Sequence, residues 1–208
     1  MAQTRKSAVV IAVLAAGASS RMRGGDKLLE RVGDEAVLRR QARLAADTGA
    51  PVIVAVPVDR PDRIAVMDGL AVTIVMVPDA HLGMSWSLRA ALQAARAMDL
   101  GGASGFMVLP ADMPEFTTDG LRAVIETYAS HPECIVRGTA SDGQPGHPAI
   151  CPPDLWDALE DMTGDQGGKA VIAAHSARVR LALLPGAMAI TDLDTPEDWA
   201  NWRAMSAD

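Results

Sequence analysis

Short apolar runs alternate with longer stretches of helical composition over most of the chain. Four runs are almost continuously apolar: Ala8–Ala15, Pro51–Val56, Val72–Val77 and Phe106–Leu109. Strands buried on both faces show this pattern, because helices cover both sides of a parallel sheet. We therefore interpret these four runs as strands of a parallel sheet.

The segments between these runs have the composition of helices. They are Glu35–Thr48, Asp59–Asp68, Ser85–Met98 and Thr118–Ser130. An alternation of strand and helix is typical of an α/β fold with right-handed crossovers. We expect a mostly parallel sheet with helices on both faces.

The pattern changes after about residue 131. A loop rich in Gly, Pro and polar residues is expected over Arg137–Pro148, before a short apolar run at 149–151. The remaining segments are two helical stretches, Pro153–Met162 and Gly167–His175, and two short apolar runs, Val179–Leu184 and Ala187–Ile190. Because no linker or repeat interrupts the chain, we expect residues 1–208 to form one α/β domain with a modified second half.

Composition limits the kinds of partner. The chain has 208 residues, of which 49% are hydrophobic and 22% charged, as in a soluble globular protein. Its net charge of −7 argues against nucleic-acid binding, although a local basic pocket can still hold an anion. Cys134 and Cys151 fit reduced thiols, and the apolar run at 8–16 is too short to cross a membrane. We expect a cytoplasmic protein with no membrane partner.

The first candidate site is the small-residue loop LAAGASSRM at 14–22. It follows the first strand, and the cations Arg21, Arg23 and Lys27 lie in or just beyond it. Small side chains let backbone N–H groups close around a phosphate, which Arg21 and Lys27 would neutralise. The segment is neither a P-loop nor GxGxxG. By composition alone, a solvated glycine-rich turn explains it equally well.

Two acidic segments suggest a metal site. Asp112 follows the fourth strand between two prolines, where a hard cation could use it, although a turn aspartate is the commoner explanation. Asp192 and Asp194 share one face if their segment is extended. The residues after them, 195–198, have the features of a helix N-terminus: Thr cap, Pro and two acids. Asp194 is therefore the better candidate to join Asp112 in binding Mg²⁺.

Three further segments carry weaker signals. Ser85 and Ser87 open a helix after the third strand, so they could contact a phosphate or simply cap the helix. His147 lies in the loop GQPGHP, and a lone histidine is more often structural than catalytic. Asp165 and Lys169 place an acid and a cation near a helix start.

Taken in chain order, five of these segments resemble the MobA-like nucleotidyltransferase family, and within it the molybdenum cofactor cytidylyltransferases. They are LAAGASSRM with Lys27, GMSWSL at 83–88, PADMP at 110–114, PGHP at 145–148 and DLDTPED at 192–198. The resemblance covers about residues 8–203. It implies a single-domain, Rossmann-like fold, Mg²⁺ dependence and transfer of a nucleotidyl group to a phosphorylated acceptor.

The resemblance also implies a role for individual residues. The nucleotide-binding set would be Leu14, Ala15, Ala16, Gly17, Ser19, Arg21, Lys27, Ser87 and Asp112. Arg21, Lys27 and Asp112 would be catalytic, with Asp112 and Asp194 holding Mg²⁺. The acceptor side would comprise His147, Asp165 and Lys169. Residues 8–130 would form a nucleotide-binding half and residues 131–203 an acceptor-side half.

The resemblance favours particular substrates. The guanylyl branch typically reads LAGG and GPLAG, whereas this chain reads LAAG and GMSWSL, which favours CTP over GTP. The implied acceptor is molybdopterin or the molybdenum cofactor, with a transient contact to a molybdoenzyme or its chaperone. The chain departs from the family pattern at two positions. Arg23 stands where Gly is common in the turn after Met22, and Lys169 stands where Arg is common on the acceptor side.

Other functions remain open from the sequence. A nucleotidyltransferase acting on a sugar or alditol phosphate, or one using GTP, would share the first loop and the metal ligands. A nucleotide-binding partner of molybdoenzymes without turnover is a non-enzymatic alternative. A dinucleotide-dependent oxidoreductase is disfavoured, because GxGxxG is missing after the first strand.

Overall fold

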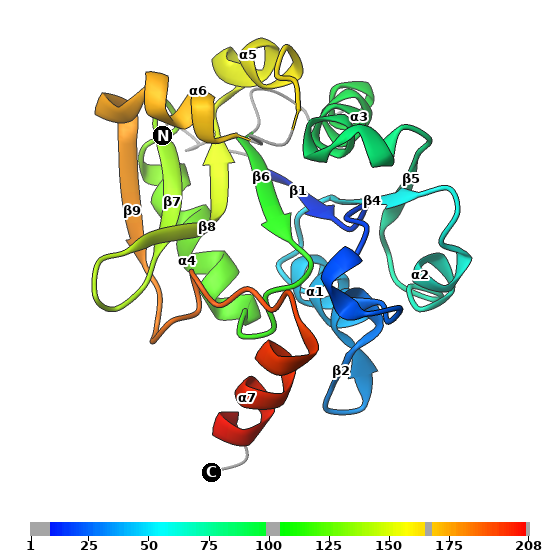
Figure 1. The fold of residues 1–208 in the computed structure, drawn as a ribbon. Helices are drawn as coiled ribbons and strands as arrows, with labels where there is room; N and C mark the ends of the chain where they lie inside the picture. Colours follow the sequence, from blue (N-terminus) through cyan, green and yellow to red (C-terminus); the bar gives the residue numbers. More distant parts are fainter. Residues whose placement is uncertain (1–8, 99–104, 165–167, 207–208) are drawn as a thin grey trace.

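The computed structural model describes residues 9–98, 105–164 and 168–206. A seven-stranded sheet crosses the molecule in the order β5-β4-β1-β6-β8-β7-β9 (Figure 1). Its strands are β1 Val9–Leu14, β4 Val52–Pro57, β5 Thr73–Val77, β6 Gly105–Pro110, β7 Ile135–Thr139, β8 Pro145–Cys151 and β9 Val179–Leu183. β8 pairs antiparallel with β6 and β7, while the other four pairs are parallel. The predicted mostly parallel sheet is confirmed, including all four of its expected strands.

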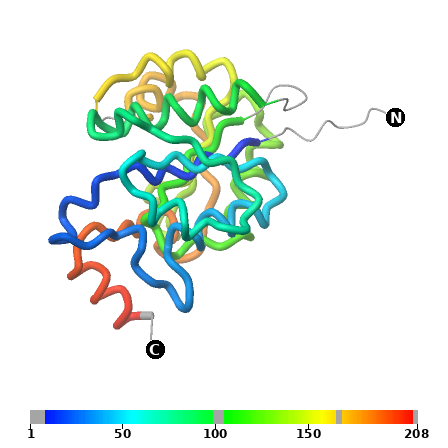
Figure 2. Tube along the Cα trace, turned by 90° about the vertical axis from the view of Figure 1, so that its right-hand side faces the viewer, coloured from blue at the N-terminus to red at the C-terminus, as the bar shows by residue number. Residues whose placement is uncertain are grey.

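Helices cover both faces of this sheet, as predicted. They are α1 Val37–Ala46, α2 Pro61–Ala65, α3 Met84–Ala97, α4 Thr118–Ser130, α5 Trp156–Glu160, α6 Lys169–Ala174 and α7 Pro196–Ser206. One apolar cluster packs α1 and α4 against side chains such as Ile11 and Leu109. A second packs α3, α5 and α6 against the opposite face, around Phe106. α7 projects from the end of the molecule opposite α5 and α6 (Figures 1 and 2).

The expected loop over Arg137–Pro148 is wrong. β7 and β8 occupy most of it, leaving a tight turn at 140–144. Glycine allows these strands to approach their neighbours closely: a Cβ on Gly138 would lie 2.3 Å from His147 O, and one on Gly146 would lie 1.8 Å from Ala189 O. The glycines that suggested a loop therefore allow close backbone packing within the sheet. The pairing of β7 with β8 is irregular, with a shift of register between Arg137 and Thr139.

Several predicted elements differ in extent. The helix expected at 35–48 begins at Val37, because residues 35–36 form β3 (Glu35–Ala36), paired with β2 (Arg31–Val32) across Gly33. The helix expected at 59–68 is the five-residue α2, and that expected at 153–162 is a 3₁₀ turn followed by α5. The apolar run at 187–190 forms a turn.

The reversed direction of β8 brings its first residues to the end of β6. Val108 of β6 pairs with Ala149 of β8. Because the strands run in opposite directions, His147 at the start of β8 lies towards the segment that follows β6. In the described part of the chain, no helix is long and apolar enough to span a membrane.

Candidate active site

Three side chains from separate sequence motifs meet at the carboxyl ends of β1 and β6. Lys27 Nζ lies 2.5 Å from Asp112 Oδ2 and 2.5 Å from Asp194 Oδ1. The side chains of Lys27 and Asp112 are only 14% and 18% exposed, so water screens their charges weakly. Arg21, which is exposed, forms an ion pair with Asp194. The structure thus brings together four of the predicted catalytic and metal-binding residues.

Lys27 stays charged in this setting. Burial lowers the pKa of its ammonium group, but the charges and hydrogen bonds of Asp112 and Asp194 outweigh burial and raise the pKa above its ordinary value. Lys27 is therefore a fixed cation at neutral pH, suited to binding phosphate oxygens and unsuited to acting as a base.

Capping of α7 positions Asp194. The Asp198 carboxylate accepts hydrogen bonds from the backbone N–H groups of Asp194 and Thr195, at 3.2 and 2.9 Å. The Asp198 N–H donates in return to the Thr195 hydroxyl at 3.1 Å. The predicted capping by Thr195 and Asp198 is confirmed, while Glu197 instead pairs with Arg23 at 2.7 Å. Capping by Asp198 leaves the Asp194 carboxylate to contact Lys27 and Arg21.

A backbone hydrogen bond ties this segment to the turn that follows β6. The N–H of Leu193 donates to Asp112 O at 3.2 Å. The side chain of Leu193 is buried in the core beneath. Asp112 and Asp194 therefore keep their relative position through a covalent and hydrogen-bonded frame as well as through Lys27.

The first loop leaves β1 with its small residues partly covered. Leu14 is half-buried, Ala15 and Ala16 are buried, and Gly17 is exposed. Ser19 is buried in a left-handed conformation with φ 53°. The roles of these residues in nucleotide binding stay predictions, as does that of Ser87, which is buried in α3.

Arg63 and Asp26, which the sequence analysis passed over, hold this loop in place. The Arg63 side chain is fully buried and donates to Asp26 Oδ2 at 2.7 Å and Oδ1 at 2.9 Å. It also donates to Ala15 O at 2.6 Å and Gly17 O at 2.8 Å. The sequence offered one faint signal, an arginine four positions before Met67 in a helical stretch.

The acceptor-side candidates come together in part. Burial, aided by the charge of Arg137, lowers the pKa of His147 to about 4, while the Asp112 carboxylate opposes this shift and Lys169 adds to it. His147 therefore lies within electrostatic range of the Lys27 cluster and is neutral at pH 7. Arg137, which sequence reasoning missed, donates to Gly146 O at 3.2 Å. Asp165 lies outside the described residues.

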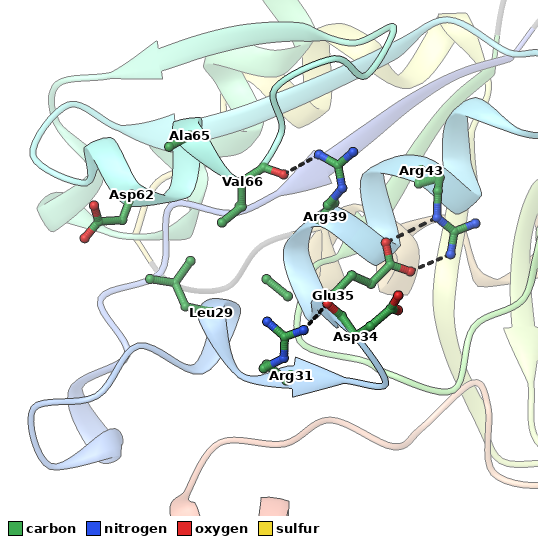
Figure 3. A pocket seen from close by; sticks show the side chains of 10 residues that line it. Leu29, Arg31, Asp34, Glu35, Arg39, Arg43, Asp62, Ala65 and Val66 are labelled. Atoms are coloured by element: carbon green, nitrogen blue, oxygen red, sulfur yellow. Dashed lines mark hydrogen bonds and ion pairs between the residues drawn. The ribbon is translucent and has the colours of Figure 1, made fainter.

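A cavity of about 720 Å³ lies elsewhere, against α1, α2 and the β2–β3 hairpin (Figure 3). Its three arginines are already engaged. Arg39 donates to Val66 O at 2.8 Å, Arg43 pairs with Glu35 at 2.5 Å, and Arg31 donates to the backbone of Asp34. None of the predicted site residues that the structure describes lines this cavity, so we do not assign the nucleotide to it.

The donor set fits a hard divalent cation shared with a substrate. Within the described residues, no group of three or more His, Cys, Asp or Glu side chains could hold a metal alone. Asp112 and Asp194 nevertheless direct carboxylate oxygens at one point, the Lys27 ammonium. Mg²⁺ is commonly bound by one or two carboxylates together with substrate phosphates and water. Two carboxylates are therefore a sufficient protein contribution.

Comparison with solved structures finds close matches to the whole fold. Rv0371c from Mycobacterium tuberculosis H37Rv is 28% identical, with a TM-score of 0.74 over 94% of this chain and 98% of that chain. Its homologue from Mycobacterium sp. strain JC1 is 26% identical, with a TM-score of 0.78 over 96% of each chain. Another structure of Rv0371C is a complex with manganese. A nucleotidyl transferase from Methanothermobacter, at 18% identity and a TM-score of 0.77 over 97% of this chain and 99% of that chain, shares the fold.

Comparison of the sequence alone gives the family. A search of curated protein sequences found no significant match. The family model for the MobA-like NTP transferase domain, however, matches residues 11–179, which include most of β1, the first loop, Asp112 and His147. The fold and this match agree: the chain is a nucleotidyltransferase that belongs to the MobA-like NTP transferase family.

Proposed function

We propose that this protein is a Mg²⁺-dependent cytidylyltransferase that transfers CMP from CTP to the phosphate of molybdopterin or the molybdenum cofactor, releasing pyrophosphate. The observation that carries the proposal is the meeting of Lys27, Asp112 and Asp194 at the end of the small-residue loop. A fixed cation and two carboxylates at one point suit a triphosphate and its metal ion.

In the proposed reaction, an oxygen of the acceptor phosphate attacks the α-phosphorus of CTP in line. A new phosphorus–oxygen bond forms, and the bond from the α-phosphorus to the pyrophosphate oxygen breaks. A phosphate monoester dianion is already nucleophilic, so no side-chain base is needed, which agrees with the low pKa of about 4 at His147. Catalysis then consists of positioning and charge stabilisation.

Arg21 and Lys27 would stabilise the negative charge that develops on the leaving pyrophosphate. Mg²⁺ held by Asp112 and Asp194 would neutralise charge on the phosphates. The manganese complex of the similar M. tuberculosis protein supports a divalent cation in this family. Lys27 now lies between both carboxylates, so the ammonium and a metal ion would compete for the same oxygen atoms.

The preference for CTP rests on the first loop. Ala16 carries a methyl group where the guanylyl branch has glycine, and its side chain is 6% exposed, packed into the core below α3. If the base binds next to this position, a methyl group in place of the glycine hydrogen would leave less room for a purine and favour a pyrimidine.

The proposed acceptor site lies on the side of β8. His147, Lys169 and Arg137 share an electrostatic environment beside Asp112, and two of them carry positive charge. This cationic setting suits a phosphorylated acceptor. A sugar or alditol phosphate would satisfy the same charges. A molybdoenzyme or its chaperone would receive the product in a transient contact.

Pyrophosphate release tests the proposal. CTP, GTP, ATP and UTP are each supplied with Mg²⁺ and molybdopterin, with and without molybdate. Release that requires both CTP and the pterin is the expected result. Release with GTP alone would overturn the base assignment, and release only with a sugar or alditol phosphate would overturn the acceptor. Nucleotide binding without release on any acceptor would favour a non-enzymatic partner of molybdoenzymes.

A further inference from the structure

The short helix α2 has two faces with different tasks. Asp62 and Ala65, together with Val66 just beyond the helix, line the open cavity shown in Figure 3. Arg63 does not line that cavity and is 0% exposed. A fully buried arginine is unusual and is retained where its charge and all its donors are matched.

The buried guanidinium is matched by a single segment of the chain, residues 15–26. Nε and Nη2 bind the two carboxylate oxygens of Asp26, at 2.7 and 2.9 Å. Nη1 donates to Ala15 O at 2.6 Å and to Gly17 O at 2.8 Å, and Nη2 also donates to Ser19 Oγ at 3.1 Å. One side chain therefore joins the beginning of the loop to its end.

Asp26 and Ser19 complete this connection from within the loop. Ser19 Oγ donates to Asp26 Oδ1 at 3.1 Å and accepts from the backbone N–H of Lys27 at 3.3 Å. Asp26 Oδ1 accepts from the N–H of Leu28 at 3.0 Å, which begins the short 3₁₀ helix Lys27–Leu29. Lys27 thus enters the active site from a backbone position that Asp26 and Ser19 define.

We propose that Arg63, paired with Asp26, is the positioning residue of the loop at residues 15–26, which would bind the nucleotide. It fixes the path of residues 15–26, so that the exposed backbone around Gly17, the Arg21 side chain and Lys27 face one triphosphate. This inference rests on the proposed nucleotidyltransferase function, because it assigns the loop to the nucleotide. Arg63 itself lies beneath the loop and touches no substrate.

A lysine could not perform this task. The guanidinium reaches two carboxylate oxygens, two carbonyl groups and a hydroxyl from one plane, whereas an ammonium is a point charge with three donors on a flexible stem. Arg63→Lys keeps the charge and loses the geometry. Asp26→Asn is the milder second variant, because it keeps the size of the side chain and the Arg63 bonds to Ala15 and Gly17.

Arg178, whose side chain is 32% exposed, provides a control with similar bonding at the β9 edge of the sheet. It binds both carboxylate oxygens of Asp154, at 2.7 and 3.0 Å, and donates to Glu133 O at 3.0 Å. The bonding resembles that of Arg63, but it lies at the start of β9. Arg178→Lys therefore measures what loss of a bidentate arginine does to the fold alone.

The experiment measures KM for CTP, KM for the acceptor and hydrogen exchange, below the unfolding transition of each variant. In Arg63→Lys we expect KM for CTP to rise about tenfold, with acceptor KM changed less than about twofold, since a misplaced contact weakens only the ligand it serves. Asp26→Asn should shift KM for CTP in the same direction. Amide exchange of residues 17–26 should accelerate in both variants and stay unchanged in Arg178→Lys.

Three results would overturn the inference and are distinguishable. Wild-type KM for CTP in folded Arg63→Lys and Asp26→Asn, with active wild-type protein, would remove Arg63 from positioning and leave the proposed function intact. Equal increases in the KM values of CTP and acceptor would show general loss of structure. A wild-type protein that binds no nucleoside triphosphate would overturn the proposed function and this inference together.

Discussion

Lys27 Nζ and Asp112 Oδ2 lie 2.5 Å apart, although 85 positions separate the two residues in the chain. The sheet explains this contact. β1 and β6 are parallel neighbours, and Leu14 at the end of β1 pairs with Pro110 at the end of β6. The segments that follow these strands therefore begin side by side, at the edge where ligands bind in open α/β sheets.

Replacing Asp112 with asparagine tests the importance of this contact for catalysis. Asp112→Asn keeps the side-chain size and removes one carboxylate from both Lys27 and the proposed metal ion. We expect kcat/KM to fall roughly 100-fold or more, the usual cost of losing one electrostatic contact in a transition state. The thermal transition should shift only slightly, because Lys27 retains Asp194 at 2.5 Å.

A matched control is Asp119→Asn, whose carboxylate is 93% exposed in the first turn of α4. It should leave kcat/KM unchanged. Full turnover by folded Asp112→Asn protein would remove Asp112 from the site.

Lys27→Met is expected to change nucleotide use and metal binding in opposite directions. The variant loses the cation that would bind the triphosphate, so turnover should fall. It also removes the ammonium that lies 2.5 Å from each of Asp112 and Asp194, so both carboxylates lose this competitor for a divalent cation, while Asp194 retains its ion pair with the exposed Arg21. Mn²⁺ affinity without nucleotide, measured by electron paramagnetic resonance, should therefore increase.

Arg23→Met serves as the control for this experiment. Arg23 carries the same charge in the same loop but pairs with Glu197 at the surface. Its removal should leave Mn²⁺ affinity unchanged. Unchanged or weaker Mn²⁺ binding by Lys27→Met would contradict competition between the ammonium and the metal.

Three of the predicted residues of this site follow one rule. Arg21, Lys27 and Asp112 lie in segments that follow strands, and parallel strands end at the same edge of a sheet. Asp194 follows from another pattern. The acids after it were expected to cap α7, which left Asp194 as the better metal ligand, and the hydrogen bonds of Thr195 and Asp198 confirm this capping. Local patterns combined with sheet geometry were sufficient here.

The parts that were not predicted depend on contacts between segments that are far apart in the sequence. Arg63 meets Asp26 only because α2 packs beneath the first loop, 37 positions away in sequence. Gly138 and Gly146 suggested a loop, because their close approach to His147 and Ala189 exists only in the folded sheet. Neither contact leaves a periodic pattern in the sequence, so hydrophobic spacing could not find it.

His147 should make stability depend on pH. Its folded-state pKa is about 4, against an ordinary value of 6.5. Between these values the unfolded chain binds a proton that the folded chain does not, so the free energy of unfolding falls as pH decreases from 6.5 towards 4. The loss from this residue should reach about 2 kcal/mol at about pH 5.

Urea unfolding of wild-type and His147→Asn protein at about pH 7.5 and pH 5 measures this contribution. The difference between the two proteins isolates the histidine from the carboxylates that also titrate in acid. His81→Asn, at an exposed position, should retain the wild-type pH dependence. An equally steep loss of stability in His147→Asn would show that another group is responsible.

Gly146→Ala should damage both the fold and the site, because the new side chain would meet backbone. Its Cβ would lie 1.8 Å from Ala189 O and 2.6 Å from Ala189 C. The turn at Ala189 cannot retreat without breaking the hydrogen bond from the His147 N–H to Ala189 O, which is 2.8 Å long. We expect a loss of about 3 kcal/mol, at the upper end of the range for overpacking.

The loss of activity in Gly146→Ala should exceed what unfolding explains. The displaced turn leads within five residues to Asp194, so a shift there moves a carboxylate away from Lys27 and Arg21. Turnover per folded molecule should therefore fall even well below the unfolding transition. In Gly168→Ala the nearest atom to the new Cβ is Leu159 Cδ2 at 3.7 Å, an ordinary contact, so this control should unfold near the wild-type temperature. Wild-type stability in Gly146→Ala would mean that the turn at Ala189 yields freely, and it could then not be what fixes Asp194.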